Sequence, residues 1–349
     1  MDTFLRALVP PLYMDHIMYR LDKNYALRVS PGVEPCPFMG GRMYRTHANV
    51  QTGLESVAQR HLAGEVDRTN LIGLNPLSAG MFPRWGTNLL GVDPAMHKCT
   101  RIVGNQLLAG NTSLLEKEVF EFREILRIVD VPEKKQKIKT WWLRTLGRYL
   151  GLGDMGSQHA LDLLQLQKNF VLKAIFLPSA LSDLQTSTIK HFEKWLAYVM
   201  QKRNCSELEG QSVMEMLIFA GGLAVSALIS TALDMRAHAR RDAIDAFIYE
   251  CARYEPPVGT YTVREKDGTL VFYSLFAALK DPAVWGPDAQ HFRVRDLAMY
   301  EKFFLGFAEP VVSPTGNKLD DRVCPGKWLT ISVLRQCVTL MLDESPTPR

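Results

Sequence analysis

A chain of 349 residues is long enough for one large domain or two small ones. Its composition, 47% hydrophobic and 22% charged, is that of an ordinary globular protein. The net charge of +4 is small and the basic residues are dispersed, which excludes the concentrated basic face of a typical nucleic-acid-binding protein. We therefore expect no nucleic-acid partner.

The first hundred residues are rich in proline and glycine, and residues 28–30 and 41–44 have the composition of short strands. We expect a single domain over residues 1–349, with an irregular, β-rich part at 1–75 and a helical core at 76–349. Apolar residues at helical spacing predict helices in the following segments: 114–128, 160–175, 184–200, 213–233, 239–254 and 328–341. Two strand-like runs flank Lys266-Asp267-Gly268, which predicts a hairpin.

Two segments could contact a membrane, and for each we weigh that interpretation against an ordinary helix of a globular protein. Residues 213–233 carry only Glu215 as a charged residue and are long enough to span a bilayer, but a buried central helix is preferred. Residues 134–148 are basic and contain Trp141 and Trp142, which is compatible with a membrane surface; a solvated helix with a packed aromatic face is preferred. We predict no transmembrane segment.

The six cysteines form no C-x-x-C pair and no zinc-type cluster. Their low density favours a reducing compartment, and the N-terminal segment lacks the pattern of a signal peptide. We expect a soluble protein of the cytoplasm or an organelle lumen, with membrane-surface association as the alternative. GLGDMG at 151–156 fits a nucleotide-binding pattern, but a helix precedes it, so a turn between helices is preferred.

Two short motifs point to chemistry. Glu250 and Arg253 form an E-x-x-R on a helix, where side chains three residues apart share a face. Cys324 lies just before a predicted helix, where the helix dipole and free N–H groups stabilise a thiolate. Gly326 permits a flat ligand to approach the backbone closely. An ordinary surface pair and a lone buried cysteine are the alternatives for the two motifs taken singly.

The order of these motifs resembles that of the cytochrome P-450 superfamily. Between E-x-x-R and R-V-C-P-G lies DPAVWGPDAQHF (281–292), and IFAGGLAVS (218–226) is similar to the helix that crosses the haem in that family. Within the superfamily, ECARYEPPV, LGFAEPVVSPTGNK and WGTNLLGVDPAMHKCTR resemble the plant-type allene oxide synthases and hydroperoxide lyases. The chain departs from them at LDDRV (319–323), which separates the N-K run from the cysteine.

The resemblance implies a mainly helical fold with a small β-sheet region, shortened at the N-terminus, and haem b with Cys324 as the ligand of its iron. It further implies a set of residues around the haem. Those expected at the propionates or the cofactor are Arg322, His97, Lys98, Arg101 and Gly326; those expected to line the distal, catalytic side are Phe219, Ala220 and Ala224. Arg295 is the nearest candidate for the family arginine that follows the P-x-x-F stretch, which is displaced in this chain.

The central helix has Leu223 and Ala224 where oxygen-activating members carry an acid and an alcohol, and neither residue relays a proton. We therefore expect an isomerase or lyase that acts on a lipophilic, pre-activated substrate such as a fatty acid hydroperoxide and needs no reductase. One alternative is a non-redox cyclase or small-molecule-binding protein with vestigial or absent haem. The other is a monooxygenase that takes its protons from ordered water.

Overall fold

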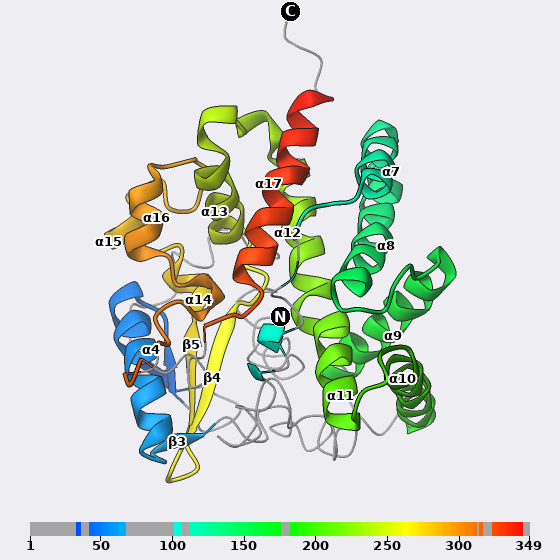
Figure 1. The fold of residues 1–349 in the computed structure, drawn as a ribbon. Helices are drawn as coiled ribbons and strands as arrows, with labels where there is room; N and C mark the ends of the chain where they lie inside the picture. The colour runs from blue at the N-terminus through cyan, green and yellow to red at the C-terminus, as the bar shows by residue number, and fades with distance from the viewer. Residues whose placement is uncertain are drawn as a thin grey trace, which may run out of the picture.

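The computed structural model has the predicted fold class, mainly helical with a small sheet (Figure 1). The structure describes residues 33–35, 42–67, 101–102, 104–106, 110, 112–175, 182–312, 314–316 and 323–344. The strand expected at residues 28–30 lies outside these ranges.

The described strands form a five-stranded sheet in the order β1-β2-β5-β4-β3. They are β1 (Val33–Pro35), β2 (Arg42–Tyr44), β3 (Val66–Asp67), β4 (Thr260–Glu265) and β5 (Leu270–Ser274). β2 and β5 are parallel and the other neighbouring pairs are antiparallel. The predicted hairpin is confirmed as β4–β5, and Gly268 in its turn has φ 83°, a conformation that costs glycine nothing.

The helices account for most of the described chain. The α-helices are α4 (His47–Leu62), α7 (Glu116–Arg127), α8 (Val131–Tyr149), α9 (Ser157–Ile175), α10 (Ser182–Arg203), α11 (Glu207–Glu215), α12 (Gly222–Asp234), α13 (Ile244–Tyr254), α14 (Leu275–Ala278), α15 (Pro282–Trp285), α16 (Leu297–Phe303) and α17 (Lys327–Asp343). The chain also forms one π-helix, η3 (Met216–Ala220). Three short segments are 3-10 helices: η4 (Arg236–His238), η5 (Arg241–Ala243) and η6 (Gly306–Ala308).

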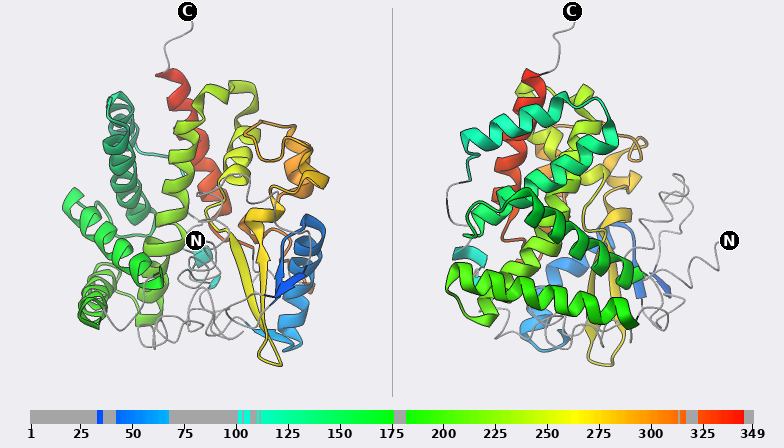
Figure 2. Two further views of the ribbon diagram at one scale, coloured as in Figure 1. Left: turned by 180° about the vertical axis from the view of Figure 1, so that it is seen from behind. Right: turned by 90° about the vertical axis from the view of Figure 1, so that its right-hand side faces the viewer.

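α12 and α17 lie side by side in the middle of the molecule (Figures 1 and 2). Helices α7 to α10 lie on one side of α12, and the sheet lies on the other side together with α4 and α14 to α16. α13 packs on both α12 and α17. The two predicted motifs, on α13 and just before α17, are therefore brought to neighbouring helices.

The expectation of an irregular, β-rich segment over residues 1–75 is wrong for residues 47–62, which form α4. Thr46 caps the helix by accepting a hydrogen bond from the N–H of Asn49, and buried residues recur at helical spacing. Gly53 lies inside α4 and weakens the helical pattern of the sequence, because glycine has a low helix propensity. It is required because the Tyr273 ring of β5 lies where a Cβ would be, at 2.1 Å.

α11, η3 and α12 run as one helix from Glu207 to Asp234. Within the described residues it is the one helix long and apolar enough to cross a membrane, but 62% of its apolar window is buried inside the protein. Val213, Leu217 and Ile229 have no exposed surface. The helix thus packs as the preferred buried central helix.

The GLGDMG segment is a turn between α8 and α9, not a nucleotide-binding loop. Gly151 and Gly153 have φ of 77° and 72°, so the turn uses the left-handed conformations that glycine permits. On α8 both Trp141 and Trp142 are buried, so the aromatic face of this basic helix points inward, as preferred from the sequence.

Candidate functional site

Cys324 lies three residues before the first residue of α17. Its N–H donates to the Phe307 carbonyl oxygen at 2.7 Å, which fixes the backbone of the loop. The thiol is half-buried, and burial raises its pKa. The backbone N–H groups of Gly326 and Lys327 and the charge of Arg101 oppose that rise in pKa. The sulfur therefore sits among donors and cations that favour a thiolate.

The segment that accepts the hydrogen bond from Cys324 N–H, around Phe307, has an unusual backbone conformation. Phe307 and Ala308 have φ of 56° and 53°, the left-handed region, where a residue with a Cβ costs roughly 1–2 kcal/mol. Together they turn the chain so that the Phe307 carbonyl faces the cysteine loop. Strain of this kind persists where surrounding contacts fix it, and it is common near functional sites.

The helical residues 101–102 and 104–106 also lie near the cysteine loop, residues 323–326. The guanidinium of Arg101 donates to the Val323 carbonyl oxygen. Gly104 is buried, and a Cβ there would lie 3.1 Å from Met216 of the central helix and 3.9 Å from Pro325. Segments around Arg101, Met216 and Phe307, far apart in the sequence, therefore come together near the cysteine loop.

Three of the residues expected at the cofactor, His97, Lys98 and Arg322, lie outside the described residues. Arg101 and Gly326 lie at the cysteine loop. The backbone of Phe219 and Ala220 belongs to η3, and Ala224 is half-buried on α12.

The central helix widens to a π-helix at Met216–Ala220. Single π-turns inside α-helices occur frequently at functional sites. Side chains from neighbouring helices bind carbonyl groups at the turn: Gln167 of α9 donates to the Leu217 oxygen at 2.9 Å, and Trp142 of α8 donates to the Gly221 oxygen at 2.8 Å. Gly222 is required because a Cβ would lie 1.8 Å from the Leu217 oxygen.

One face of α12 stays partly open to solvent in the middle of the molecule. It carries Leu223 and Ala224, which are half-buried, and Ala227, which is exposed. The nearby hydroxyl of Ser226 is buried and donates to the Gly222 oxygen at 2.8 Å. Thr231 likewise donates to the Ala227 oxygen at 3.1 Å. The open face is therefore apolar, and these hydroxyl protons are used by the helix itself.

Glu250 and Arg253 form a fully buried ion pair on α13, with two hydrogen bonds of 2.7 Å. The remaining N–H groups of Arg253 bind backbone oxygens between α14 and the segment before α16. The acceptors are Leu279 at 2.8 Å, Ala289 at 2.7 Å and His291 at 3.0 Å. The pair therefore ties α13 to the chain that follows the hairpin.

Arg295, which the resemblance named only as the arginine after the P-x-x-F stretch, joins this pair. One of its amino groups lies 3.2 Å from Glu250 Oε1, and the other lies 3.0 Å from Asp288 Oδ1. The Tyr300 hydroxyl donates to Glu250 Oε2 at 2.8 Å and was not expected from the sequence. Burial and the Glu250 carboxylate raise the pKa of Tyr300, which keeps its hydroxyl protonated as a donor.

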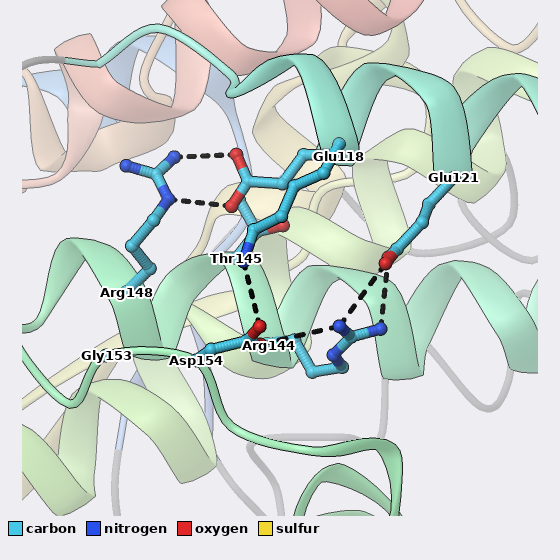
Figure 3. Close-up of a pocket in the computed structure, with 8 residues that line it drawn as sticks. Glu118, Glu121, Arg144, Thr145, Arg148, Gly153 and Asp154 are labelled. Atoms are coloured by element: carbon cyan, nitrogen blue, oxygen red, sulfur yellow. Dashed lines mark hydrogen bonds and ion pairs between the residues drawn. The ribbon is translucent and has the colours of Figure 1, made fainter.

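A second group of charges lines a surface hollow between α7, α8 and the 151–156 turn (Figure 3). Arg148 pairs with Glu118, Arg144 with Glu121, and Lys117 with Asp154. The opposite charges neutralise one another and join α7 to α8, so this hollow has the character of a structural brace.

No family model matches the sequence, and no curated protein matches it. Solved cytochromes P450, in contrast, align with nearly the whole chain. A substrate-free cytochrome P450 of Mycobacterium marinum has a TM-score of 0.63 at 16% identity, over 97% of this chain and 89% of that one. The chain has the cytochrome P450 fold.

Two further structures support this fold. P450BioI, solved with an acyl carrier protein ligated to hexadec-9Z-enoic acid, has a TM-score of 0.66 at 15% identity, over 96% of this chain and 93% of that one. A thermophilic cytochrome P450 from Sulfolobus tokodaii has a TM-score of 0.62 at 18% identity, over 93% and 91%.

The cytochrome P450 fold implies a haem, and the described residues around Cys324 fit one. A thiolate ligand is favoured by N–H groups and cations close to the sulfur, and Cys324 has both in Gly326, Lys327 and Arg101. The apolar open face of α12 suits a flat hydrophobic group. Within the described residues no cluster of three or more His, Cys, Asp or Glu side chains is arranged to hold a metal ion. A single cysteine suffices where a macrocycle supplies the other ligands.

Proposed function

We propose that this chain is a haem-thiolate enzyme that rearranges or cleaves a lipophilic, pre-activated substrate, such as a fatty acid hydroperoxide, without a reductase. Cys324 would hold the iron of haem b, with Arg101, Arg322, His97 and Lys98 near the propionates. The whole chain would form one such domain, in the cytoplasm or an organelle lumen, with no nucleic-acid partner.

The observation that carries the proposal is the open face of α12. Activation of dioxygen requires protons delivered by polar side chains, and Leu223, Ala224 and Ala227 provide none. The hydroxyl of Ser226 is buried and donates its proton to its own helix. When bound, haem supplies an iron able to cleave the O–O bond of a hydroperoxide, which brings its own oxidising equivalents. The protein's part is to orient an apolar chain and keep water away from it.

The likeness of ECARYEPPV and LGFAEPVVSPTGNK to allene oxide synthases and hydroperoxide lyases supports the reaction class. The long acyl chain carried by the partner of P450BioI supports a lipophilic substrate, since that protein has the same fold. Phe219, Ala220 and Ala224 would line the substrate side. Ala224 has no polar group that could direct the reaction, so the product has to be identified by experiment.

The first test is the absorption spectrum of the purified protein, reduced under carbon monoxide. The wild type should show the band of thiolate-ligated haem, and Cys324→Ser should lose it. Cys205→Ser is the matched control, because Cys205 is also a half-buried free thiol but lies between α10 and α11. A folded, colourless wild type would instead favour the non-redox cyclase or binding protein.

The second test separates the reaction classes. The protein alone should consume fatty acid hydroperoxides, and Ala224→Leu, which fills the open face, should lower the rate. Ser226→Ala should leave the rate unchanged, since its hydroxyl serves the helix. Turnover that needs a reductase and NADPH, and that falls in Ser226→Ala, would restore the monooxygenase.

A further inference from the structure

Lys327 and Glu309 form an ion pair beside the cysteine loop, with 2.9 Å between Nζ and Oε1. Both side chains are largely covered, with 13% and 24% of their surface exposed. The ammonium also lies over the rings of Trp328, at 4.7 Å, and Tyr249, at 6.0 Å. Charges covered in this way are screened less by water than a surface pair.

This pair is coupled to Cys324 through both of its members. Lys327 begins α17, and its backbone N–H donates to the Cys324 carbonyl oxygen at 3.3 Å. Glu309 follows the left-handed residues Phe307 and Ala308, and the Phe307 carbonyl accepts the hydrogen bond from Cys324 N–H. A single strained turn therefore fixes the backbone of the cysteine loop and places the carboxylate that neutralises Lys327.

The sign of each charge determines its effect on the sulfur. A cation near a thiolate stabilises electron density there and makes the attached centre easier to reduce, while an anion does the opposite. Burial raises the pKa of Glu309, and the ammonium of Lys327 opposes that rise. Glu309 thus offsets a charge that would otherwise act on Cys324 undiminished.

We propose that Glu309 and Lys327 are a charge-compensating pair that sets the reduction potential of the centre held by Cys324. Both are positioning residues, because they act through the sulfur and its loop. The inference rests on the haem-thiolate part of the proposed function. By cancelling the cation, Glu309 keeps the potential low, which disfavours electron uptake and suits an enzyme that needs no reductase.

The test is a redox titration of the haem-loaded protein and its variants. Glu309→Gln should raise the potential and Lys327→Gln should lower it, each by about a tenfold change in the ratio of reduced to oxidised protein, or about 59 mV. The double variant should lie near the wild type. Asp245→Asn is the matched control, because it breaks the more exposed pair between Asp245 of α13 and Arg335 of α17 and should shift the potential by less than a third as much.

The outcomes distinguish the two proposals. A wild type without the thiolate band contradicts the proposed function itself. A wild type with that band, but with single variants that do not shift or that shift in the same direction, overturns the charge-compensating pair. If Glu309→Gln fails to hold haem, Glu309→Asp should keep the wild-type potential and Lys327→Gln should still lower it; any other result rejects the inference.

Discussion

Two clusters in this molecule combine arginine with glutamate, and their surroundings differ. Around Glu250, both Arg253 and Arg295 lie inside the protein, with at most 6% of either side chain exposed. Around Glu118, the partner Arg148 has 22% of its side chain exposed, and the neighbouring Asp154 has 59% (Figure 3). The ionic groups are similar, but their access to water is not.

The difference shows what each cluster contributes. A charged group that water cannot reach must form all of its hydrogen bonds with protein groups. Arg253 makes five such bonds, three of them to backbone carbonyls. Those carbonyls define the path of the chain between α14 and α16. In the second cluster Glu118 is buried, but its partner Arg148 reaches water, so this cluster strengthens the α7–α8 contact without specifying the fold.

The largest effect is expected at the buried cluster. Glu250→Ala leaves Arg253 and Arg295 as buried charges without their carboxylate, which should cost about 3–5 kcal/mol of unfolding free energy. Urea unfolding followed by circular dichroism measures it, and we expect unfolded or haem-free protein. A Glu250→Ala protein with wild-type stability would show that the E-x-x-R match is accidental.

The second prediction concerns Lys280, which donates to the Tyr254 carbonyl oxygen at 2.7 Å behind the same cluster. Burial and the nearby Arg253 lower its pKa from 10.5 to about 7. Between those values the unfolded chain binds a proton that the folded protein does not. Stability should therefore rise with pH from about 7 to 10.5, by at most about 1.4 kcal/mol per unit.

Lys280→Met removes this titrating group, so the unfolding free energy of the wild type minus that of the variant should increase as pH rises from 7. Urea midpoints at pH 7, 8 and 9 give that difference free of other titrating groups. A difference that stays constant with pH would mean that Lys280 remains protonated when folded.

A smaller effect is expected at the Glu118 cluster, where Glu118 is buried but its partner Arg148 is partly exposed. Glu118→Gln removes a charge that accepts two hydrogen bonds of 2.7 Å from Arg148 and one of 2.8 Å from the N–H of Leu115. The expected loss is about 1–2 kcal/mol, with haem content unchanged. Loss of haem from this variant would show that the α7–α8 brace also holds the site.

The smallest effect is expected for Asp154→Asn. Its bond to Lys117 is exposed on both sides, so stability should change by less than about 0.5 kcal/mol, and salt should remove even that. A thermal melt in low and high salt measures the change. A loss comparable to that of Glu118→Gln would contradict the distinction between covered and exposed pairs.

The sequence motifs anticipated much of the candidate site, because they lie on continuous elements. Glu250 and Arg253 share a helix face, so three-residue spacing was enough to predict their contact. Cys324 was proposed as the ligand from its position before α17 together with the order of the motifs, which resembles that of the cytochrome P-450 superfamily. Arg295, Tyr300 and the Lys327–Glu309 pair involve loops and short helices, whose contacts have no periodic signal.

The sequence predicted the helical class, the hairpin and the buried central helix, because each follows from local spacing and turn chemistry. Tertiary structure alone decided the rest. It made α4 a helix around a glycine that Tyr273 requires, and it created the π-turn at Met216–Ala220, whose carbonyls are bound from α8 and α9. These features depend on packing between distant segments, which local sequence patterns do not encode.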